Sequence, residues 1–161
     1  MKLEGSCHCG KVSFTLESAH PYPFNVCYCS ICRKTAGGGG YAINLGGVAN
    51  SLSVSGEADI SVYRATLDDS DGNPELSPCE RRFCSACGSA LWVWDPRWPE
   101  LIHPFASAID TPLPRAPERT HLMQAYKPAW VDAKRTESDQ DFDEYPQESI
   151  ADWHQRLKLP D

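Results

Sequence analysis

The stretch Cys7-His8-Cys9-Gly10, near the start of the chain, has a counterpart far downstream in Cys84-Ser85-Ala86-Cys87-Gly88. Each stretch carries two closely spaced cysteines and ends in glycine, the residue that most readily adopts the positive φ of a tight turn. Two short cysteine pairs far apart in sequence are typical of a closed tetrahedral zinc site. Joining them closes a loop of roughly 75 residues, which is entropically costly without such a link. We therefore predict a structural zinc ion held by Cys7, Cys9, Cys84 and Cys87.

A second group of cysteines lies in Cys27-Tyr28-Cys29-Ser30-Ile31-Cys32-Arg33-Lys34. Thiols at positions i, i+2 and i+5 can converge on one point if the backbone turns tightly. Three thiolates leave one tetrahedral position open, which is the arrangement of a catalytic zinc whose fourth ligand exchanges. We predict a second, more labile zinc ion and a catalytic role for Cys27, Cys29 and Cys32. Two alternatives stay open: Cys79 closes this site or lies as a spare ligand near the first, or the three thiols bind no metal.

Composition narrows the class of protein. The 161 residues are 41% hydrophobic, which fits one globular domain, and the formal net charge of -7 argues against a nucleic-acid or anionic-membrane partner. We see neither an apolar run long enough to span a membrane nor an apolar secretory segment at the start. The expected location is therefore cytoplasmic, where clustered cysteines bind metals more often than they form disulfides.

The residues after the second cysteine group are candidates for substrate binding. Arg33 and Lys34 favour thiolates and could attract an anionic ligand. The run Gly37-Gly38-Gly39-Gly40 exposes backbone amides, and Gly38 and Gly39 at its centre could approach a carboxylate closely. The alternatives are a pair of solvated cations and a flexible turn. We expect His8, between two cysteines, to point away from the metal.

The hydrophobic pattern predicts a mainly β protein. Short alternating or apolar stretches predict strands at 11–16, 41–45, 52–54, 60–64, 90–94, 101–109 and 121–126. The polar segment Asp68–Pro74 predicts a surface loop, since turn residues fill it. Ser149 and Asp152 resemble a helix-capping pair, with Pro160 as the stop, so we expect one short helix near the C-terminus. We assign residues 1–131 to the zinc-binding domain and residues 132–161 to an acidic extension that carries this helix.

Three ordered motifs together resemble those of a known family: Gly5-Ser6-Cys7-His8-Cys9-Gly10-Lys11-Val12, Cys27-x-Cys29-Ser30-x-Cys32-Arg33-Lys34 and Phe83-Cys84-x-x-Cys87-Gly88-Ser89. The family is that of the glutathione-dependent formaldehyde-activating enzymes, which share a domain with centromere protein V. The late pattern of His121, Lys127 and Trp130 resembles its C-terminal signature. The resemblance spans residues 3–131. At position 28 this chain has Tyr where many members have His, and Cys79 is additional.

The resemblance implies an Mss4-like fold of small coiled antiparallel sheets stapled by zinc. It implies the same division of ligands, with Cys7, Cys9, Cys84 and Cys87 structural and Cys27, Cys29 and Cys32 catalytic. The implied activity is that of a carbon–sulfur lyase that forms S-hydroxymethylglutathione from formaldehyde and glutathione, although another thiol or small aldehyde would suit the same chemistry. The alternative is a non-enzymatic, zinc-stapled protein-binding module with an exposed apolar patch, for which Trp92, Trp94, Trp98 and Trp130 are candidates. We expect Trp92 and Trp94 to pack in the core instead. The sequence leaves the oligomeric state open.

Overall fold

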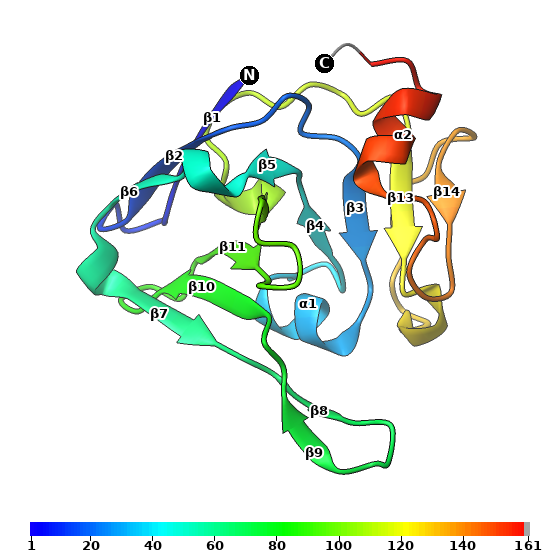
Figure 1. The fold of residues 1–161 in the computed structure, drawn as a ribbon, viewed down its shortest axis with the longest axis horizontal. Helices are drawn as coiled ribbons and strands as arrows, with labels where there is room; N and C mark the ends of the chain where they lie inside the picture. The colour runs from blue at the N-terminus through cyan, green and yellow to red at the C-terminus, as the bar shows by residue number, and fades with distance from the viewer. Residues whose placement is uncertain (160–161) are drawn as a thin grey trace.

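The first strands of the chain form a three-stranded antiparallel sheet in the computed structural model, which describes residues 1–159 (Figure 1). Its strands in spatial order are β1 (Lys2–Ser6), β2 (Ser13–Glu17) and β6 (Ser53–Ser55). Gly5 lies opposite Phe14 in this sheet, and a Cβ at Gly5 would come within 2.4 Å of the Phe14 ring. Only glycine fits this position, because the ring lies directly over the backbone.

A five-stranded sheet forms the middle of the molecule. Its order is β5 (Gly47–Val48), β12 (Leu101–Pro104), β11 (Ala90–Trp94), β10 (Glu80–Cys84) and β7 (Ile60–Tyr63). The strand expected at 101–109 ends early, at Pro104, and the short 3-10 helix Ala106–Ala108 follows. Proline lacks the amide donor that a continuing strand would need.

The third sheet combines parallel and antiparallel pairs. Its order is β14 (Gln140–Asp141), β13 (Arg119–Leu122), β3 (Phe24–Cys27) and β4 (Ala42–Asn44). The strand β13 runs parallel to both of its neighbours, whereas the other sheets are antiparallel. The strand expected at 121–126 begins two residues earlier and ends at Leu122, because Met123 adopts a positive φ of 63° and starts the 3-10 helix Gln124–Tyr126.

Two short α-helices accompany the sheets. Helix α2 (Ile150–Arg156) is the C-terminal helix, and its capping box confirms the predicted pairing of Ser149 with Asp152. Its predicted stop, Pro160, lies outside the described residues. Helix α1 (Ser30–Thr35) was not expected from the sequence and falls in the second cysteine group. The tight turn that we predicted there is therefore a turn of helix.

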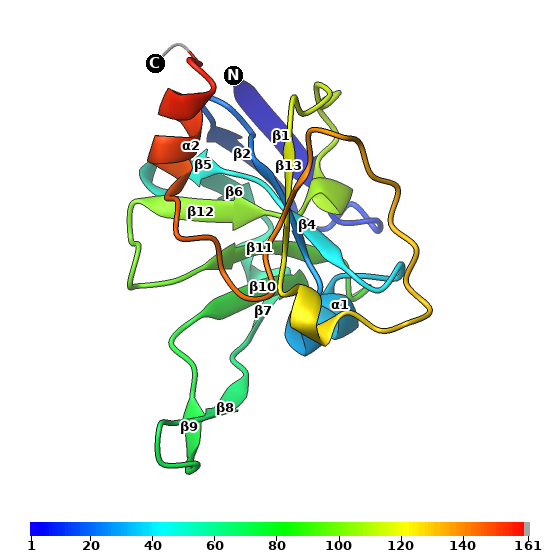
Figure 2. The same cartoon turned by 90° about the vertical axis from the view of Figure 1, so that its right-hand side faces the viewer.

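The predicted polar loop at Asp68–Pro74 is the tip of a hairpin. Strands β8 (Thr66–Asp68) and β9 (Pro74–Leu76) pair with each other, and the hairpin reaches away from the rest of the fold in both Figure 1 and Figure 2. Further single turns of 3-10 helix lie at Ala49–Ser51 and Glu57–Asp59. No helix within residues 1–159 has the length and apolar character needed to cross a membrane.

The buried side chains fall into separate clusters, and each of two clusters contains cysteines. One lies beneath the N-terminal sheet and includes Cys7 and Cys84 together with Phe14 and Trp92. The other includes Cys27 and Cys32 together with Phe105, Leu122 and Met123. The fold thus separates the two predicted ligand sets into different parts of the core. The mainly β prediction, with small sheets and a short C-terminal helix, is confirmed.

Candidate metal centres and the adjoining cavities

The four cysteines of the two distant stretches meet in one place. The sulfurs of Cys7, Cys9, Cys84 and Cys87 all lie within 4.8 Å of one another. The Sγ–Sγ distance is 3.5 Å between Cys7 and Cys9 and 3.7 Å between Cys9 and Cys84. The turns that bring them together end in Gly10 and Gly88, whose φ angles are +76° and +75°. His8 is exposed and lies outside the sulfur cluster, as we expected.

The three cysteines of the second group also converge. The sulfurs of Cys27, Cys29 and Cys32 lie within 4.8 Å of one another, and helix α1 explains why. Strand β3 ends at Cys27, Cys29 is the N-cap of the helix, and its Sγ accepts a hydrogen bond from the Cys32 amide at 3.3 Å. Cys27 and Cys32 are buried, and Cys29 is half-buried. We call these three residues the cysteine trio.

The chemistry of both clusters suits a soft cation. Without one, the trio shares its charge unequally: the Cys27 and Cys32 thiols lower the pKa of Cys29 by hydrogen bonding, and the same contact with Cys29 raises the pKa of Cys27. Three thiolates so close together repel one another unless a cation lies among them. All eight cysteines are free thiols, so none is withdrawn into a disulfide. Each cluster could therefore hold a metal ion, and sulfur ligands are those that zinc favours.

Cys79 belongs to neither sulfur cluster. It packs against the core around the trio, where the guanidinium of Arg81 lies between it and Cys32. The Arg81 Nη1 donates to Cys79 Sγ at 3.5 Å, and its Nη2 approaches Cys32 Sγ at 4.0 Å. Arg81 therefore places a positive charge beside the trio. We did not single out Arg81 from the sequence, because only the pairing of β10 with its neighbours distinguishes its side chain from that of Arg82.

The predicted substrate-binding residues line a cavity next to the four-cysteine cluster. This cavity has a volume of about 710 Å³, and Arg33, Lys34 and Gly38 line it together with Cys7 and His8. Gly39, the fourth predicted residue, does not line it. None of the trio cysteines lines this cavity either. Its connection to the trio is indirect, through Ala36 and Ala90, which line it and also pack against the trio's core.

A second cavity adjoins the first, and one of its lining residues, Arg81, contacts the trio. Its volume is about 320 Å³, it is lined by Arg81 and Phe105, and it shares Thr35, Gly88 and Ala90 with the first cavity. Two buried side-chain nitrogens along these cavities have no hydrogen-bond partner within the described residues, namely Arg33 Nε and Arg81 Nε. Unpaired buried donors of this kind are rare in proteins. We call the two cavities together the cationic groove.

The four glycines divide into two groups. A Cβ at Gly37 would come within 2.0 Å of the Tyr41 carbonyl oxygen, and one at Gly40 would come within 2.3 Å of Val131. These two are required by the fold. A Cβ at Gly38 would meet nothing within 4 Å, and one at Gly39 would make only ordinary contacts with Tyr41. The fold therefore does not require glycine at these two central positions.

The tryptophans divide between the core and the surface. Trp92 is buried in the core, as we expected, whereas Trp94 is only half-buried and lies outside the core clusters of the described residues. Trp98 and Trp130 are exposed, at 50% and 67%. These two residues are the surface candidates that the binding-module alternative named.

The fold and the two sulfur clusters define a mainly β protein with two sites that could hold metal ions. A family model described as glutathione-dependent formaldehyde-activating enzyme matches residues 2–125, and the chain belongs to this family. A similar protein from Halomonas elongata is 64% identical over 159 residues, covers 99% of this chain and 98% of its own length, and is provisionally named for the same activity. A crystal structure of a Rhodobacter sphaeroides protein matches with a TM-score of 0.51 at 24% identity. The match covers 70% of this chain and 92% of the other, and it supports the fold alone.

Proposed function

We propose that this protein joins glutathione and formaldehyde into S-hydroxymethylglutathione at the cysteine trio, as an enzyme of the carbon–sulfur lyase class. Membership of the family supports an enzyme that acts on formaldehyde and glutathione. The observation that carries the finer proposal is the cationic lining of the two adjoining cavities: Arg33 and Lys34 line one, and Arg81, whose Nη2 approaches Cys32 Sγ at 4.0 Å, lines the other.

Glutathione matches the charge pattern of this groove. It is an extended tripeptide with a carboxylate at each end and its thiol near the middle. Arg33 and Lys34 lie at the end of the groove near the four-cysteine cluster, and Arg81 lies at the end near the trio. Guanidinium–carboxylate hydrogen bonds are among the strongest polar contacts in proteins. The backbone of Gly38, which lines the same cavity as Lys34, adds a further donor.

The reaction moves one proton and forms one bond. The glutathione sulfur adds to the carbonyl carbon of formaldehyde, so a C–S bond forms, the C=O π bond breaks, and the thiol proton ends on the new hydroxyl oxygen. A zinc ion held by Cys27, Cys29 and Cys32 would supply a Lewis acid that favours the thiolate form of a coordinated thiol. Arg81 contributes a fixed positive charge beside the trio, which favours the thiolate form of a sulfur bound there.

The two clusters then have different tasks. We assign a structural zinc ion to Cys7, Cys9, Cys84 and Cys87, and a labile, catalytic zinc ion to the trio. An Mss4-like fold and a cytoplasmic location accompany this assignment. Tyr28 and the additional Cys79 are departures from the family pattern, and an aldehyde other than formaldehyde would undergo the same thiol addition.

The test is the rate at which formaldehyde and glutathione exchange with their adduct at equilibrium, measured by NMR exchange spectroscopy. Thiols add to formaldehyde without a catalyst, so the enzyme-free rate is subtracted at each concentration. We expect the zinc-loaded protein to accelerate exchange, Cys29→Ser to abolish the acceleration, and Cys79→Ser, a matched cysteine outside both sulfur clusters, to retain it. Equal rates with and without the protein would refute the proposed activity.

A further inference from the structure

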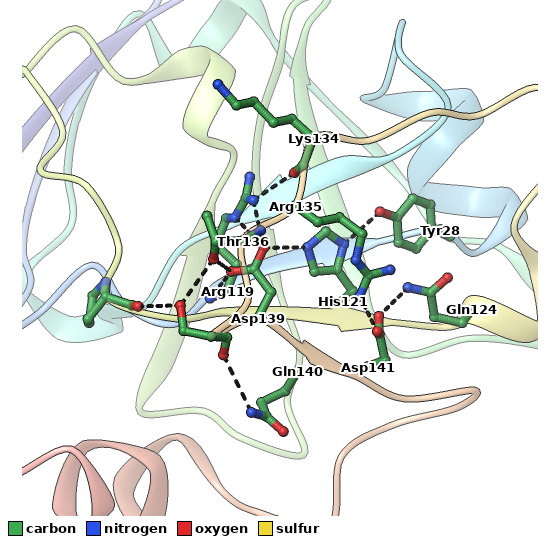
Figure 3. Close-up of polar contacts among 12 residues, drawn as sticks. Tyr28, Arg119, His121, Gln124, Lys134, Arg135, Thr136, Asp139, Gln140 and Asp141 are labelled. Atoms are coloured by element: carbon green, nitrogen blue, oxygen red, sulfur yellow. Dashed lines mark hydrogen bonds and ion pairs between the residues drawn. The ribbon is translucent and has the colours of Figure 1, made fainter.

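A chain of buried polar groups runs from Tyr28, which stands between Cys27 and Cys29, through His121 to Asp139 (Figure 3). The Tyr28 hydroxyl is 2.7 Å from His121 Nδ1, and His121 Nε2 is 3.3 Å from Asp139 Oδ2. Tyr28 and His121 are completely buried, and the Asp139 side chain is 1% exposed. Arg119 and Thr136 surround the carboxylate, with Arg119 Nη2 at 2.6 Å and the Thr136 amide at 3.0 Å. Such a closed set of hydrogen bonds fixes the rotamer of every member.

The direction of each hydrogen bond follows from the carboxylate. Burial by itself raises the pKa of Asp139, but the hydrogen bonds from Arg119 and Thr136 outweigh it and hold that pKa well below its ordinary value. An ionised carboxylate only accepts, so His121 Nε2 carries a proton and donates it. Burial lowers the pKa of His121, which keeps the ring neutral, so Nδ1 is an acceptor for the Tyr28 hydroxyl. The chain of donation therefore runs from Tyr28 through His121 to Asp139.

Tyr28 lies between two of the trio cysteines, on the opposite face of the backbone. Side chains alternate along an extended strand, so Cys27 packs in the cluster with Leu122 and Met123, whereas Tyr28 packs with Val26 and Val131. The backbone is held as well, since the Tyr28 amide donates to the Leu122 carbonyl at 3.2 Å. The Tyr28 ring is thus an anchor for the short segment that carries Cys27 and Cys29.

The far end of this chain comes from the C-terminal extension. Asp139 lies beyond residue 125, where the match to the family model ends, and directly precedes β14, which pairs with β13. The extension also bonds to the residue that follows β13, because the Met123 amide donates to the Glu144 carbonyl at 3.1 Å. Residues from the extension therefore contact both β13, the strand that pairs with β3, and the turn directly after it.

We infer that Tyr28, His121 and Asp139 are positioning residues that hold Cys27 and Cys29 at the spacing required for metal binding, so that the extension is part of the trio site. The inference rests on the proposed function in one respect, namely that the trio binds a metal ion. Residues that orient metal ligands from behind commonly change metal affinity by 10- to 100-fold when they are altered. We expect an effect of this size at the trio and none at the four-cysteine cluster.

The test is a chelator titration of protein loaded with Co²⁺, whose thiolate absorption bands report each cluster. Cys29→Ser identifies the bands of the trio. Tyr28→Phe removes one hydroxyl and leaves the ring, and Asp139→Asn removes the charge at the other end. The control is Tyr41→Phe, because the Tyr41 ring packs edge-on against Tyr28 with centroids 5.7 Å apart but its hydroxyl lies outside the hydrogen-bonded chain.

We expect Tyr28→Phe and Asp139→Asn to release the trio metal at a chelator concentration at least tenfold lower than the parent protein, with altered trio bands. The four-cysteine bands and the Tyr41→Phe titration should match the parent. Equal weakening of both clusters would show a general structural role and overturn the inference, as would unchanged release in both variants. A parent protein that binds no metal at the trio would overturn the metal-based function as well as this inference. If the parent binds metal at both clusters and the variants release it as the parent does, only this inference is overturned.

Discussion

Cys7, Cys9, Cys84 and Cys87 reach their meeting point from two segments 75 residues apart, whereas Cys27, Cys29 and Cys32 come from one turn of chain around helix α1. Both clusters present sulfur atoms within 4.8 Å of one another. The first cluster offers four ligands, which complete a tetrahedron, and the second offers three. Two of the four sulfurs in the first cluster belong to exposed residues, while two of the three in the trio belong to buried ones.

This difference shows that exposure of the cysteines and availability of a free metal position are separate properties. A closed ligand set can lie at the surface, because a metal with no free position gives a substrate no place to bind. The trio is more buried, yet it has one ligand fewer and the guanidinium of Arg81 beside it. Our proposal that the trio is the reactive site therefore rests on the number of ligands and the neighbouring charge, and not on the burial of the cysteines.

The largest expected effect comes from removing one ligand of the four-cysteine cluster. Cys84→Ser should leave the protein unfolded, because structural zinc contributes about 10 kcal/mol or more and a domain of this size is stable by only about 5–15 kcal/mol. Circular dichroism and thermal unfolding measure this. Cys29→Ser is the comparison, and it should fold and lose only one metal ion. A folded Cys84→Ser protein would contradict the structural assignment.

Chelation should separate the clusters without mutation. The trio metal has an exchangeable position and should leave at a lower chelator concentration, with the far-UV spectrum unchanged. Loss of the metal from the four-cysteine cluster should coincide with unfolding, since its ligands join distant segments. Elemental analysis and circular dichroism on the same samples test this order. Release of both metals in one step, together with the fold, would remove the distinction between the clusters.

The groove should depend on the arginine that lies beside the trio. Arg81→Met should weaken glutathione binding by roughly 10- to 100-fold, because a hydrogen bond to a charged group contributes about 1.5–3 kcal/mol. Isothermal titration with glutathione measures this. Arg64→Met is the control: Arg64 also lies near β10, but its guanidinium pairs with Glu80 and lines neither cavity of the groove. Equal losses in the two variants would point to net charge alone.

The smallest effect is expected at the eighth cysteine. Cys79→Ser should leave the metal content unchanged and alter the free energy of unfolding by about 1 kcal/mol at most, because Cys79 lies outside both sulfur clusters. Elemental analysis and thermal unfolding are sufficient measurements. Loss of the trio metal in this variant would mean that Cys79 moves to close the site when metal is bound.

Much of the ligand assignment could be made from spacing. The pairing of Cys7 and Cys9 with Cys84 and Cys87 follows from two short pairs that each end in a turn-forming glycine. The capping pair of Ser149 and Asp152 could also be predicted from the sequence. The ends of the strands were harder to predict, because the ends of β12 and β13 depend on Pro104 and on the positive φ of Met123 within the assembled sheets.

Contacts between distant segments could not be predicted from the sequence. Helix α1 is only six residues long, and its cap is a cysteine rather than one of the usual capping residues, so no sequence signal marked it. Arg81 became a candidate only when strand pairing placed its guanidinium between Cys79 and Cys32. Similarly, the sequence placed Asp139 only in an acidic extension, whereas the structure buries its carboxylate against Arg119 and His121.

The sequence by itself determined which cysteines form each cluster and that the protein is mainly β, because ligand spacing, glycine turns and alternating apolar residues are local properties. Only the tertiary structure decided what surrounds the clusters. The cationic groove, the position of Cys79 outside both sulfur clusters and the buried chain from Tyr28 to Asp139 each join residues that are far apart in sequence. Such contacts depend on how the sheets pack together, and no local pattern specifies that packing.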